Sequence, residues 1–308
     1  MILAIDLGGT EVKMGRADRL GNLYETISAS VSFDGYKTPL LTTVLKTAET
    51  FLASWPDKPE GIAVSACGQV DSEAGVVIGT NGNIPGYEGT KLKAALEEAF
   101  GVKTRALNDA NAAVLGEAFT GRAKGLRDVL MITLGTGVGG GVITGGRLLD
   151  GRRGIAGELG QFTLRADGPL CPCGKRGIYE YYASTTALVR QCAERTGREG
   201  LNGKIIFGEI SLGNEVFRSV LEDWIRDIAE GLTSLVHLFN PEMILIGGGV
   251  SRQQKLLINP LREAVLRGCM PRFAEGLRIE SGPEGTRVSF CVPLKSREEI
   301  ADDEGISG

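Results

Sequence analysis

The sequence predicts an α/β protein with two domains around a cleft, and three observations lead to this fold class. Short apolar runs that suit buried strands end in glycine-rich turns near residues 6, 135 and 247. Amphipathic segments with helical spacing lie between these runs, so strand and helix alternate in both halves of the chain. The chain has 308 residues, 42% of them hydrophobic, which is enough to bury two cores of ordinary size.

The first apolar run ends at Asp6, which precedes a Gly8-Gly9 turn and Thr10. A carboxylate at the end of a buried strand can hold Mg²⁺ through water, while a glycine turn beside it faces a phosphate. The same residue types also make ordinary turns, so this motif alone leaves both interpretations open. The strands expected in this region cover 2–5, 12–17 and 23–30.

Strands and helices should alternate after residue 30. An asparagine-rich loop at 81–87 includes Asn83, whose amide offers a donor and an acceptor and so suits a sugar hydroxyl. Asparagine is also common in turns, and without further evidence a turn is the favoured interpretation. The expected helices cover 39–54 and 90–100, and the expected strands cover 61–66, 68–77 and 102–107.

Asn108 and Asp109 open a helix that should run to about Phe119. Either residue is an ordinary helix N-cap. A carboxylate at a strand-to-helix junction can instead accept a proton from a substrate alcohol. Beside the positive end of a helix dipole, Asp109 would act through its position more than through its basicity.

The stretch 129–144 carries the strongest phosphate signal. A strand over 129–134 enters a turn, 135–141, in which five of seven residues are glycine, and a second strand, 142–144, follows at once. Dense glycine lets backbone N–H groups approach a phosphate, and Thr136 adds a hydroxyl donor. The alternative interpretation is a structural hairpin that merely tolerates glycine. It is disfavoured because similar motifs occur elsewhere in the chain.

A third motif of this kind follows a long amphipathic helix over 214–239. The helix is closed by Asn240, and strand 243–246 then enters the turn 247–249. His237, the only histidine, lies amid leucines near the end of this helix, so we expect a core or helix-end residue rather than a metal ligand. Two similar α/β domains with nucleotide phosphates between them is the economical interpretation.

Composition excludes several other functions. No apolar run approaches the ~18 residues of a membrane span, and the N-terminus lacks the layout of a signal peptide. A net charge of −4 with scattered positive residues argues against nucleic acid as the main partner. Six cysteines in a chain of this length fit reduced thiols. We therefore expect a cytoplasmic protein that binds a small molecule, with no membrane or nucleic-acid partner.

Together, the motifs resemble the ROK family (repressors, open reading frames and sugar kinases) of the actin-like ATPase superfamily, over about residues 1–280. The resemblance implies two actin-like (ribonuclease H-like) α/β domains around a nucleotide and sugar cleft. It also implies ATP and Mg²⁺ as cofactors, a sugar as substrate and a homodimer. Five segments in family order and at family spacing carry it: 6–10, 108–113, 134–141, 156–160 and 247–249.

Carried over residue by residue, the resemblance makes Asp109 the general base that activates a hexose 6-hydroxyl toward the γ-phosphate. Phosphoryl transfer requires positioning and charge neutralisation more than covalent help, which fits this role. Sugar hydroxyls would be bound by Asn83, Asn108, Glu158, Gln161 and Glu180. Phosphate and Mg²⁺ (the latter through water on Asp6) would face Asp6, Gly8, Gly9, Thr10, Gly135, Thr136 and Gly137, and the nucleoside would face Gly248.

The chain departs from the family at its structural zinc site. Typical members use a histidine and three cysteines; here Gln161 and Ile178 stand in place of two ligands, while Cys171 and Cys173 remain. Structural zinc needs four ligands, so we expect none. Apolar and aromatic packing should hold segment 168–182 instead. The missing histidine normally contacts the sugar, so the identity of the sugar stays open.

The domains expected from this resemblance cover 1–118 and 119–280. Family members end in a helix that packs on the first domain, but residues 281–308 depart from this pattern. Segment 296–304 has one large apolar residue, which cannot make a core-facing stripe, so we expect a loose tail and hypothesise that the final helix was lost.

The sequence thus predicts a cytoplasmic, ATP-dependent hexose kinase that is glucokinase-like and lacks zinc. The nearest alternative is a kinase for another sugar: a β-glucoside, N-acetylmannosamine, allose or fructose. A sugar-responsive repressor is disfavoured, because such members carry a helix-turn-helix before the first strand, which begins here at Ile2. A non-catalytic sugar-binding protein is disfavoured by Asp109 and the intact phosphate loops.

Overall fold

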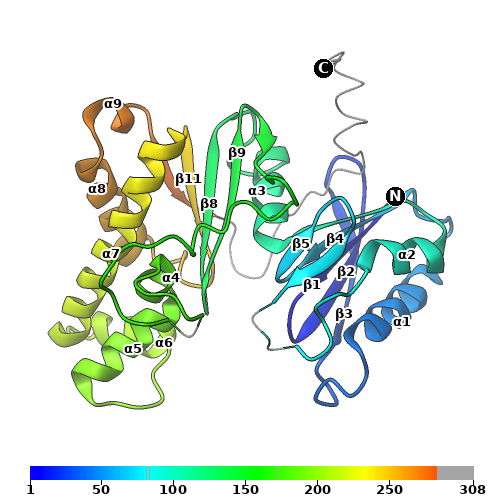
Figure 1. Ribbon diagram of the computed structural model, residues 1–308, viewed down its shortest axis with the longest axis horizontal. Helices are drawn as coiled ribbons and strands as arrows, with labels where there is room; N and C mark the ends of the chain where they lie inside the picture. The colour runs from blue at the N-terminus through cyan, green and yellow to red at the C-terminus, as the bar shows by residue number, and fades with distance from the viewer. Residues whose placement is uncertain (81, 83, 172, 283–308) are drawn as a thin grey trace. The chain divides into compact units, whose positions relative to one another are not determined.

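The computed structural model describes residues 1–80, 82, 84–171 and 173–282, and the chain forms two compact units. Within these ranges unit 1 comprises 1–120 and 150–156, and unit 2 comprises 121–149 and 157–282. Both units combine a five-stranded sheet with helices (Figure 1). The predicted α/β fold class is confirmed.

A mixed sheet forms the centre of unit 1. Its strands are β1 (Ile2–Leu7), β2 (Glu11–Ala17), β3 (Leu23–Ser30), β4 (Gly61–Ala66) and β7 (Thr104–Asn108). They lie in the order β3-β2-β1-β4-β7; the first three are antiparallel, and β4 and β7 run parallel to β1. Every residue of β4 is buried, as expected of a central parallel strand.

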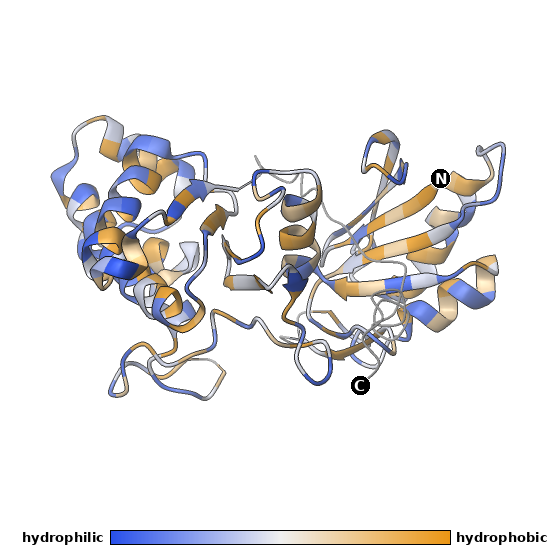
Figure 2. Ribbon diagram, turned by 90° about the horizontal axis from the view of Figure 1, so that it is seen from above, coloured by the Kyte–Doolittle hydropathy of each residue, from blue (hydrophilic) through white to orange (hydrophobic). Residues whose placement is uncertain are grey.

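The helices of unit 1 begin and end within two residues of the predicted limits. They are α1 (Leu40–Leu52), α2 (Leu92–Phe100) and α3 (Asp109–Phe119). Gly101, at a left-handed φ of 62°, ends α2, and the Asn108 side chain caps α3. Figure 2 shows hydrophobic residues along the strands and mixed hydropathy along the helices, as amphipathic packing requires.

The predicted single strand over 68–77 is wrong. Two short antiparallel strands, β5 (Gln69–Asp71) and β6 (Val76–Gly79), occupy the region. The Asp71 carboxylate accepts the N–H groups of Glu73 and Ala74, and Gly75 adopts a φ of 64°. Our reading of the sequence missed this aspartate-to-glycine turn, which reverses the chain.

Unit 2 repeats the strand order of unit 1. Its strands are β8 (Val129–Leu134), β9 (Val138–Thr144), β10 (Arg147–Leu148), β11 (Met243–Gly247) and β12 (Arg278–Ser281). In the order β10-β9-β8-β11-β12, the first three are antiparallel and the last two run parallel to β8. The expectation of two similar α/β halves is therefore confirmed at the level of topology.

The predicted glycine turn 135–141 is too long, because β9 already begins at Val138. Gly139, Gly140 and Gly141 pair with β8. A Cβ at Gly140 would lie 2.4 Å from Cγ of Leu159, so this glycine lets the segment 157–161 lie close against the strand. The turn proper is Gly135–Gly137.

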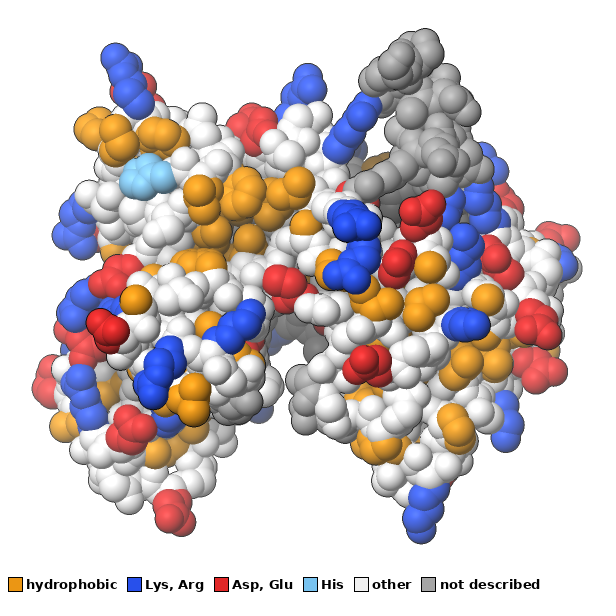
Figure 3. Space-filling view, in the orientation of Figure 1, with side chains coloured by type: hydrophobic (Ala, Val, Ile, Leu, Met, Phe, Trp, Pro, Cys, Tyr) orange, Lys and Arg blue, Asp and Glu red, His pale blue; other side chains and the backbone are white. Residues whose placement is uncertain are grey.

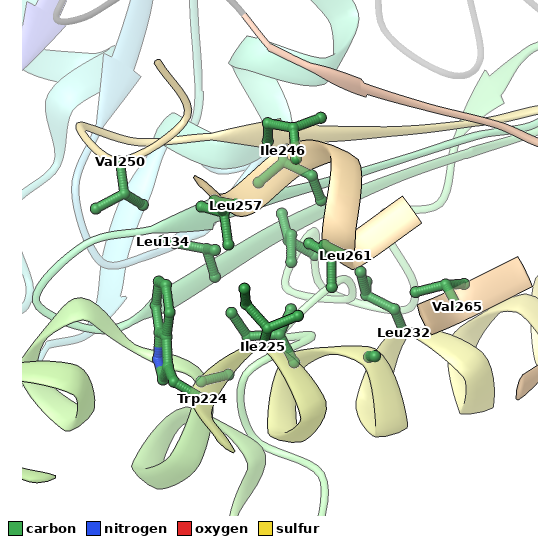
Figure 4. Close-up of a cluster of buried hydrophobic side chains, with 14 of the residues drawn as sticks. Leu134, Trp224, Ile225, Leu232, Ile246, Val250, Leu257, Leu261 and Val265 are labelled. Atoms are coloured by element: carbon green, nitrogen blue, oxygen red, sulfur yellow. The ribbon is translucent and has the colours of Figure 1, made fainter. Parts of the chain in front are cut away.

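Helices provide most of the core of unit 2. They are α4 (Tyr179–Ala183), α5 (Thr185–Thr196), α6 (Gly203–Ser211), α7 (Glu215–Phe239), α8 (Asn259–Gly268) and α9 (Pro271–Ala274), with a π-helical turn, η1 (Gln254–Ile258), before α8. The long helix α7 confirms the predicted one. Its buried side of Trp224, Ile225 and Leu232 faces Leu134 and Ile246 of the sheet (Figure 4).

His237 lies in the last turn of α7, as predicted for a helix-end residue. Its Nε2 accepts the backbone N–H of Met270 at 3.1 Å, and its ring meets Phe273 edge to face. Figure 3 shows the imidazole at the surface, and it shows acidic and basic side chains interspersed over both units.

The expected loose tail lies outside the described residues except for Ser281, which ends β12, and Gly282, whose N–H donates to Ile246 at 2.7 Å. Among the described helices, none combines the length and apolar content needed to cross a bilayer.

Candidate active site

Three neighbouring parallel strands of unit 1 end at one edge of its sheet. Asp6 lies near the end of β1, Cys67 directly follows β4, and Asn108 ends β7 next to Asp109. In open α/β sheets, ligands bind in the crevice outside the carboxyl ends of the strands. The site residues predicted for this unit and described by the structure therefore gather where such a fold binds its ligand.

Asp6 is paired with a buried serine that the sequence did not reveal. Ser65, fully buried on β4, donates its hydroxyl to Oδ1 of Asp6 at 3.0 Å. Burial raises the pKa of Asp6, while Ser65 and Lys13 act in the opposite direction. A cation beside this carboxylate would offset the cost of burying its charge, so the residues present fit a Mg²⁺ site.

The first glycine turn is held by its carbonyl groups. The Tyr36 hydroxyl donates to the Gly9 carbonyl at 2.6 Å, and the Val31 N–H donates to the Thr10 carbonyl at 2.9 Å. The Gly8 N–H donates to the Glu11 carbonyl at 3.0 Å, which closes the turn. Gly8 therefore uses its N–H in the turn itself.

Asn108 uses its whole amide to hold the start of α3. Its Oδ1 accepts the N–H groups of Ala110 and Asn111. Its Nδ2 donates to the Gly68 carbonyl and to Oδ1 of Asp109, at 2.9 Å in both cases. The N-cap interpretation of Asn108 is confirmed. Asp109 also accepts the Ala110 N–H at 2.8 Å, so its orientation is set by two donors.

Cys67 directly follows β4, which lies between β1, the strand of Asp6, and β7, the strand that ends at Asn108. Burial raises the pKa of its thiol; the negative charges of Asp109 and Asp6 also raise it, whereas Tyr87 lowers it. Tyr87, itself buried, donates its hydroxyl to the Cys67 carbonyl at 3.1 Å. Sequence reasoning missed Cys67 and Tyr87, because only strand order brings them to the site.

In unit 2, the start of α5 holds the second glycine turn. Carbonyl groups of the three residues 134–136 accept, in order, the Thr185 hydroxyl, the Thr185 N–H and the Thr186 hydroxyl. The Gly135 N–H donates to the Gly137 carbonyl at 3.0 Å. Thr185 and Thr186 carried no recognisable signal in the sequence, since their partners lie 50 residues earlier.

Glu180 reaches the same turn from α4. Its Oε2 accepts the Val138 N–H at 2.9 Å, and a Cβ at Gly137 would lie 2.3 Å from that oxygen. Its own backbone N–H donates to the Gly160 carbonyl at 2.9 Å. The structure thus brings together two residues predicted for different ligands, Glu180 and Gly137.

The segment containing Glu158 and Gln161 lies against β9. The Gln161 N–H donates to the Glu158 carbonyl at 3.0 Å, which makes a tight turn. A Cβ at Gly160 would lie 2.3 Å from the Val138 carbonyl oxygen, so the turn follows the start of the strand closely. Glu158, Gln161 and Glu180 are therefore carried by segments that meet beside the second glycine turn.

The third glycine turn lies beside the second, because β11 pairs with β8. Gly248 has a φ of 92°, and a Cβ there would lie 2.2 Å from the Leu134 carbonyl oxygen. Both facts require glycine.

Of the predicted site residues, Asn83 lies outside the described residues.

Packing holds the region of the altered zinc motif, as predicted. Ile178 and Tyr179 are fully buried; Tyr179 stacks on Phe162 with ring centroids 4.8 Å apart and donates its hydroxyl to the Ile228 carbonyl at 2.8 Å. Across the described part of the chain, no three His, Cys, Asp or Glu side chains are grouped to hold a metal ion.

The same strand order, with a glycine turn after the first strand of each sheet, occurs in both units, so the chain belongs to the class of proteins built from two repeated α/β units. The ROK family profile matches residues 2–279, and the chain belongs to this family. The predicted family and its glucokinase-like, sugar-kinase class are confirmed.

Named relatives agree with this assignment. The chain is 33% identical over 297 residues to a glucokinase of Thermotoga maritima, covering 92% of each chain. It is 37% identical over 255 residues to a β-glucoside kinase of Listeria monocytogenes, covering 81% of this chain and 83% of the other. A ROK glucokinase of Streptomyces griseus, solved with glucose and AMPPNP, superposes with a TM-score of 0.76 at 30% identity, covering 94% and 96%.

Proposed function

We propose that this protein is an ATP-dependent hexose kinase that transfers the γ-phosphate to a sugar hydroxyl, the 6-hydroxyl of glucose or a related sugar. The observation that carries the proposal is the setting of Asp109. It stands at the carboxyl edge of the unit 1 sheet, and two donors from Asn108 and Ala110 fix its orientation.

Asp109 acts as the general base. It accepts the proton of the sugar hydroxyl as the oxygen attacks phosphorus, and its fixed position supplies the catalytic advantage. Asn108 orients this carboxylate. The resemblance also assigns it a sugar contact, for which its Nδ2 would exchange one of the two acceptors that it holds here, the Gly68 carbonyl or Asp109. Further sugar contacts are assigned to Asn83, Glu158, Gln161 and Glu180, and Gly248 is assigned to the nucleoside.

Phosphate binding divides between the two glycine turns. In unit 1, Gly8 has committed its N–H, so Gly9 and Thr10 supply the donors. In unit 2, Gly135 and Val138 have committed theirs, so the N–H groups of Thr136 and Gly137 and the Thr136 hydroxyl remain for a phosphate among the described residues. Asp6 would hold Mg²⁺ through water, and this ion neutralises phosphate charge when bound.

The acceptor sugar is assigned more narrowly by analogy. Glucose is the first candidate, since glucokinases are among the relatives and one of them binds glucose. A β-glucoside is the second, because a β-glucoside kinase is 37% identical to this chain. The homodimer and the cytoplasmic location also belong to this proposal.

Replacing the base tests the proposal. Asp109→Asn should lower kcat by roughly 10²–10⁴ while leaving ATP binding and the fold intact, because only the proton acceptor is lost. Turnover is measured by coupled ADP release on a panel of hexoses and β-glucosides, and folding by circular dichroism.

Asp57→Asn is the matched control, since this exposed aspartate lies beyond α1. It should turn over like the natural protein. Turnover of folded Asp109→Asn at the natural rate would remove Asp109 from the mechanism, and no turnover of any sugar by the natural protein would reject the kinase proposal.

A further inference from the structure

A short antiparallel ladder of backbone hydrogen bonds carries two residues assigned to the sugar, Gln161 and Glu180. Its two segments are 160–165 and 177–180. The Glu180 N–H donates to the Gly160 carbonyl at 2.9 Å, and the Leu164 N–H donates to the Gly177 carbonyl at 2.8 Å. The ladder therefore fixes the two segments relative to each other, and its place in unit 2 depends on what anchors each of them.

The second segment is anchored to α7 by aromatic side chains. The Tyr179 hydroxyl donates to the Ile228 carbonyl at 2.8 Å. A Cβ at Gly231 would overlap the Tyr179 ring, so a glycine on α7 makes room for this ring. Just beyond α4, the Ser184 carbonyl accepts the indole N–H of Trp224 at 3.0 Å. Hydrogen bonds and close packing thus hold the second segment and α4 against the helix.

Arg165, at the end of the first segment, makes the corresponding anchor. Its Nη2 donates to Oδ1 of Asp227 at 2.6 Å and to Oε2 of Glu230 at 2.9 Å. These two carboxylates are three residues apart on α7, so they lie on one face of the helix and share the cation. The guanidinium also lies over the Tyr182 ring, 4.6 Å from its centroid. One side chain therefore ties the first segment to both α7 and α4.

Burial makes this anchor stronger than an ordinary surface ion pair. The side chain of Asp227 is only 12% exposed. Burial raises the pKa of Asp227, whereas the hydrogen bond and charge of Arg165 lower it. A buried carboxylate that loses its cation is strongly destabilised, so this pair resists being pulled apart. The backbone of Arg165 is enclosed as well, because a Cβ at Gly177 would overlap its carbonyl group.

We propose that Arg165 is a positioning residue for the sugar: its ion pairs with α7 fix the segment that bears Gln161. The altered zinc motif lacks two of the four ligands of typical family members, at Gln161 and Ile178. Arg165 lies outside that motif and holds the same region to the helix by ion pairing. The effect on the sugar rests on the proposed function, whereas the anchoring of the segment does not.

Kinetics of Arg165→Met test the positioning role. Methionine keeps a long stem beside Tyr182 and removes the charge. We expect KM for the sugar to rise roughly 10-fold, because a displacement of about 1 Å can cost up to ~10²-fold. KM for ATP should change little. Arg165→Lys keeps a cation beside Asp227 but loses the planar fork, so it should recover part of the lost affinity.

A double variant separates positioning from stability. Arg165→Met with Asp227→Leu removes both charges, so no carboxylate is left buried without its cation. Its melting temperature should return toward that of the natural protein, because replacing both partners by apolar groups is nearly neutral. KM for the sugar should stay raised, since the anchor is still absent. Recovery of both properties would show that Arg165 serves stability alone and would overturn the positioning role.

Hydrogen exchange tests the anchor independently of any activity. In Arg165→Met, the N–H groups of Leu164 and Glu180 should exchange faster, because the ladder that they close has lost one support. Exchange in β8 and β9 should not change. Dialysis of the natural protein against a metal chelator should leave the ladder protected. Unchanged exchange in Arg165→Met would contradict the anchor, and faster exchange after chelation would show that a metal holds the segment instead.

Arg195→Met is the matched control. Arg195 of α5 pairs with Asp223 on α7, one turn before Asp227, and it is 48% exposed against 42% for Arg165. It holds α5 rather than the ladder, so both ladder exchange and KM for the sugar should match the natural protein. An equal rise in KM would overturn the specific role of Arg165. If the natural protein phosphorylates no sugar, the proposed function fails while the exchange result still decides the anchor.

Discussion

The glycine turns of the two units occupy the same place in sheets of the same strand order, but different surroundings hold them. The turn after β1 is held by Tyr36 and Val31, and Gly9 in it has space, because a Cβ there would lie 3.6 Å from Ile84. The turn after β8 is enclosed by α5, by Glu180 and by the turn after β11.

From this difference we infer that the two turns have different roles. The open turn lies at the end of the strand that bears Asp6, whose buried carboxylate suits a cation. The enclosed turn is fixed by protein groups, so it is preorganised for the phosphate that we propose it binds, and it tolerates few substitutions. Substitutions at Gly137 and Gly248 should therefore damage the fold, whereas a substitution at Gly9 should mainly affect ligand binding.

The largest loss of stability is expected for Gly248→Ala. The new Cβ would meet the Leu134 carbonyl oxygen, which is backbone and cannot move aside, at a positive φ. Strain of this kind costs about 1–3 kcal/mol before the clash is added, so unfolding in urea should shift by more than that. Gly249→Ala, with no atom near its Cβ, is the control and should unfold like the natural protein.

Gly137→Ala should cost less, because the obstructing atom is the end of a side chain. Glu180 would swing away and leave the Val138 N–H without its acceptor, at a cost of about 1–3 kcal/mol. KM for the sugar should rise as well. Gly135→Ala, whose Cβ meets nothing within 4 Å, is the control; equal damage from both would show that Glu180 is not the cause.

Ser65→Ala should cost about 0.5–1.5 kcal/mol, with a characteristic pH dependence. Burial raises the pKa of Asp6 above its ordinary 3.8, so the folded state holds this proton more tightly than the unfolded state. The resulting stability is present below the unfolded pKa and is lost as pH rises through the folded pKa. Removing Ser65 raises the folded pKa further and deepens the loss at neutral pH.

Melting temperatures of Ser65→Ala and the natural protein, measured from acidic to neutral pH with and without MgCl₂, report the loss of stability. Mg²⁺ should restore part of the stability of Ser65→Ala at neutral pH, because it stabilises the ionised carboxylate. Ser28→Ala on exposed β3 is the control. A loss that is the same at acidic and neutral pH would separate Ser65 from the Asp6 charge.

Gly9→Ala should have the smallest effect on stability, within about 0.5 kcal/mol, since its Cβ makes an ordinary contact with Ile84. If the backbone at Gly9 approaches a phosphate, KM for ATP should nevertheless rise. A variant as unstable as Gly137→Ala would contradict the contrast between the two turns.

The sequence by itself determined the elements whose causes are local. The helix from Asp109 follows from its asparagine cap, and α7 follows from 25 residues of regular amphipathic spacing. The glycine turns at strand ends, which we propose bind phosphate, were located from the sequence for the same reason. Periodicity and turn propensity depend on neighbouring residues, so these signals survive without any tertiary contact.

Only the tertiary structure decided which distant residues serve those motifs. Ser65 meets Asp6 because β1 and β4 pair in register, and Thr185 holds a turn 50 residues before it. Gly140 lies in β9 because it pairs with β8, and the absence of a side chain there lets the segment 157–161 lie close against the strand. Such contacts arise from packing between segments far apart in the chain, and no local pattern of residues encodes them.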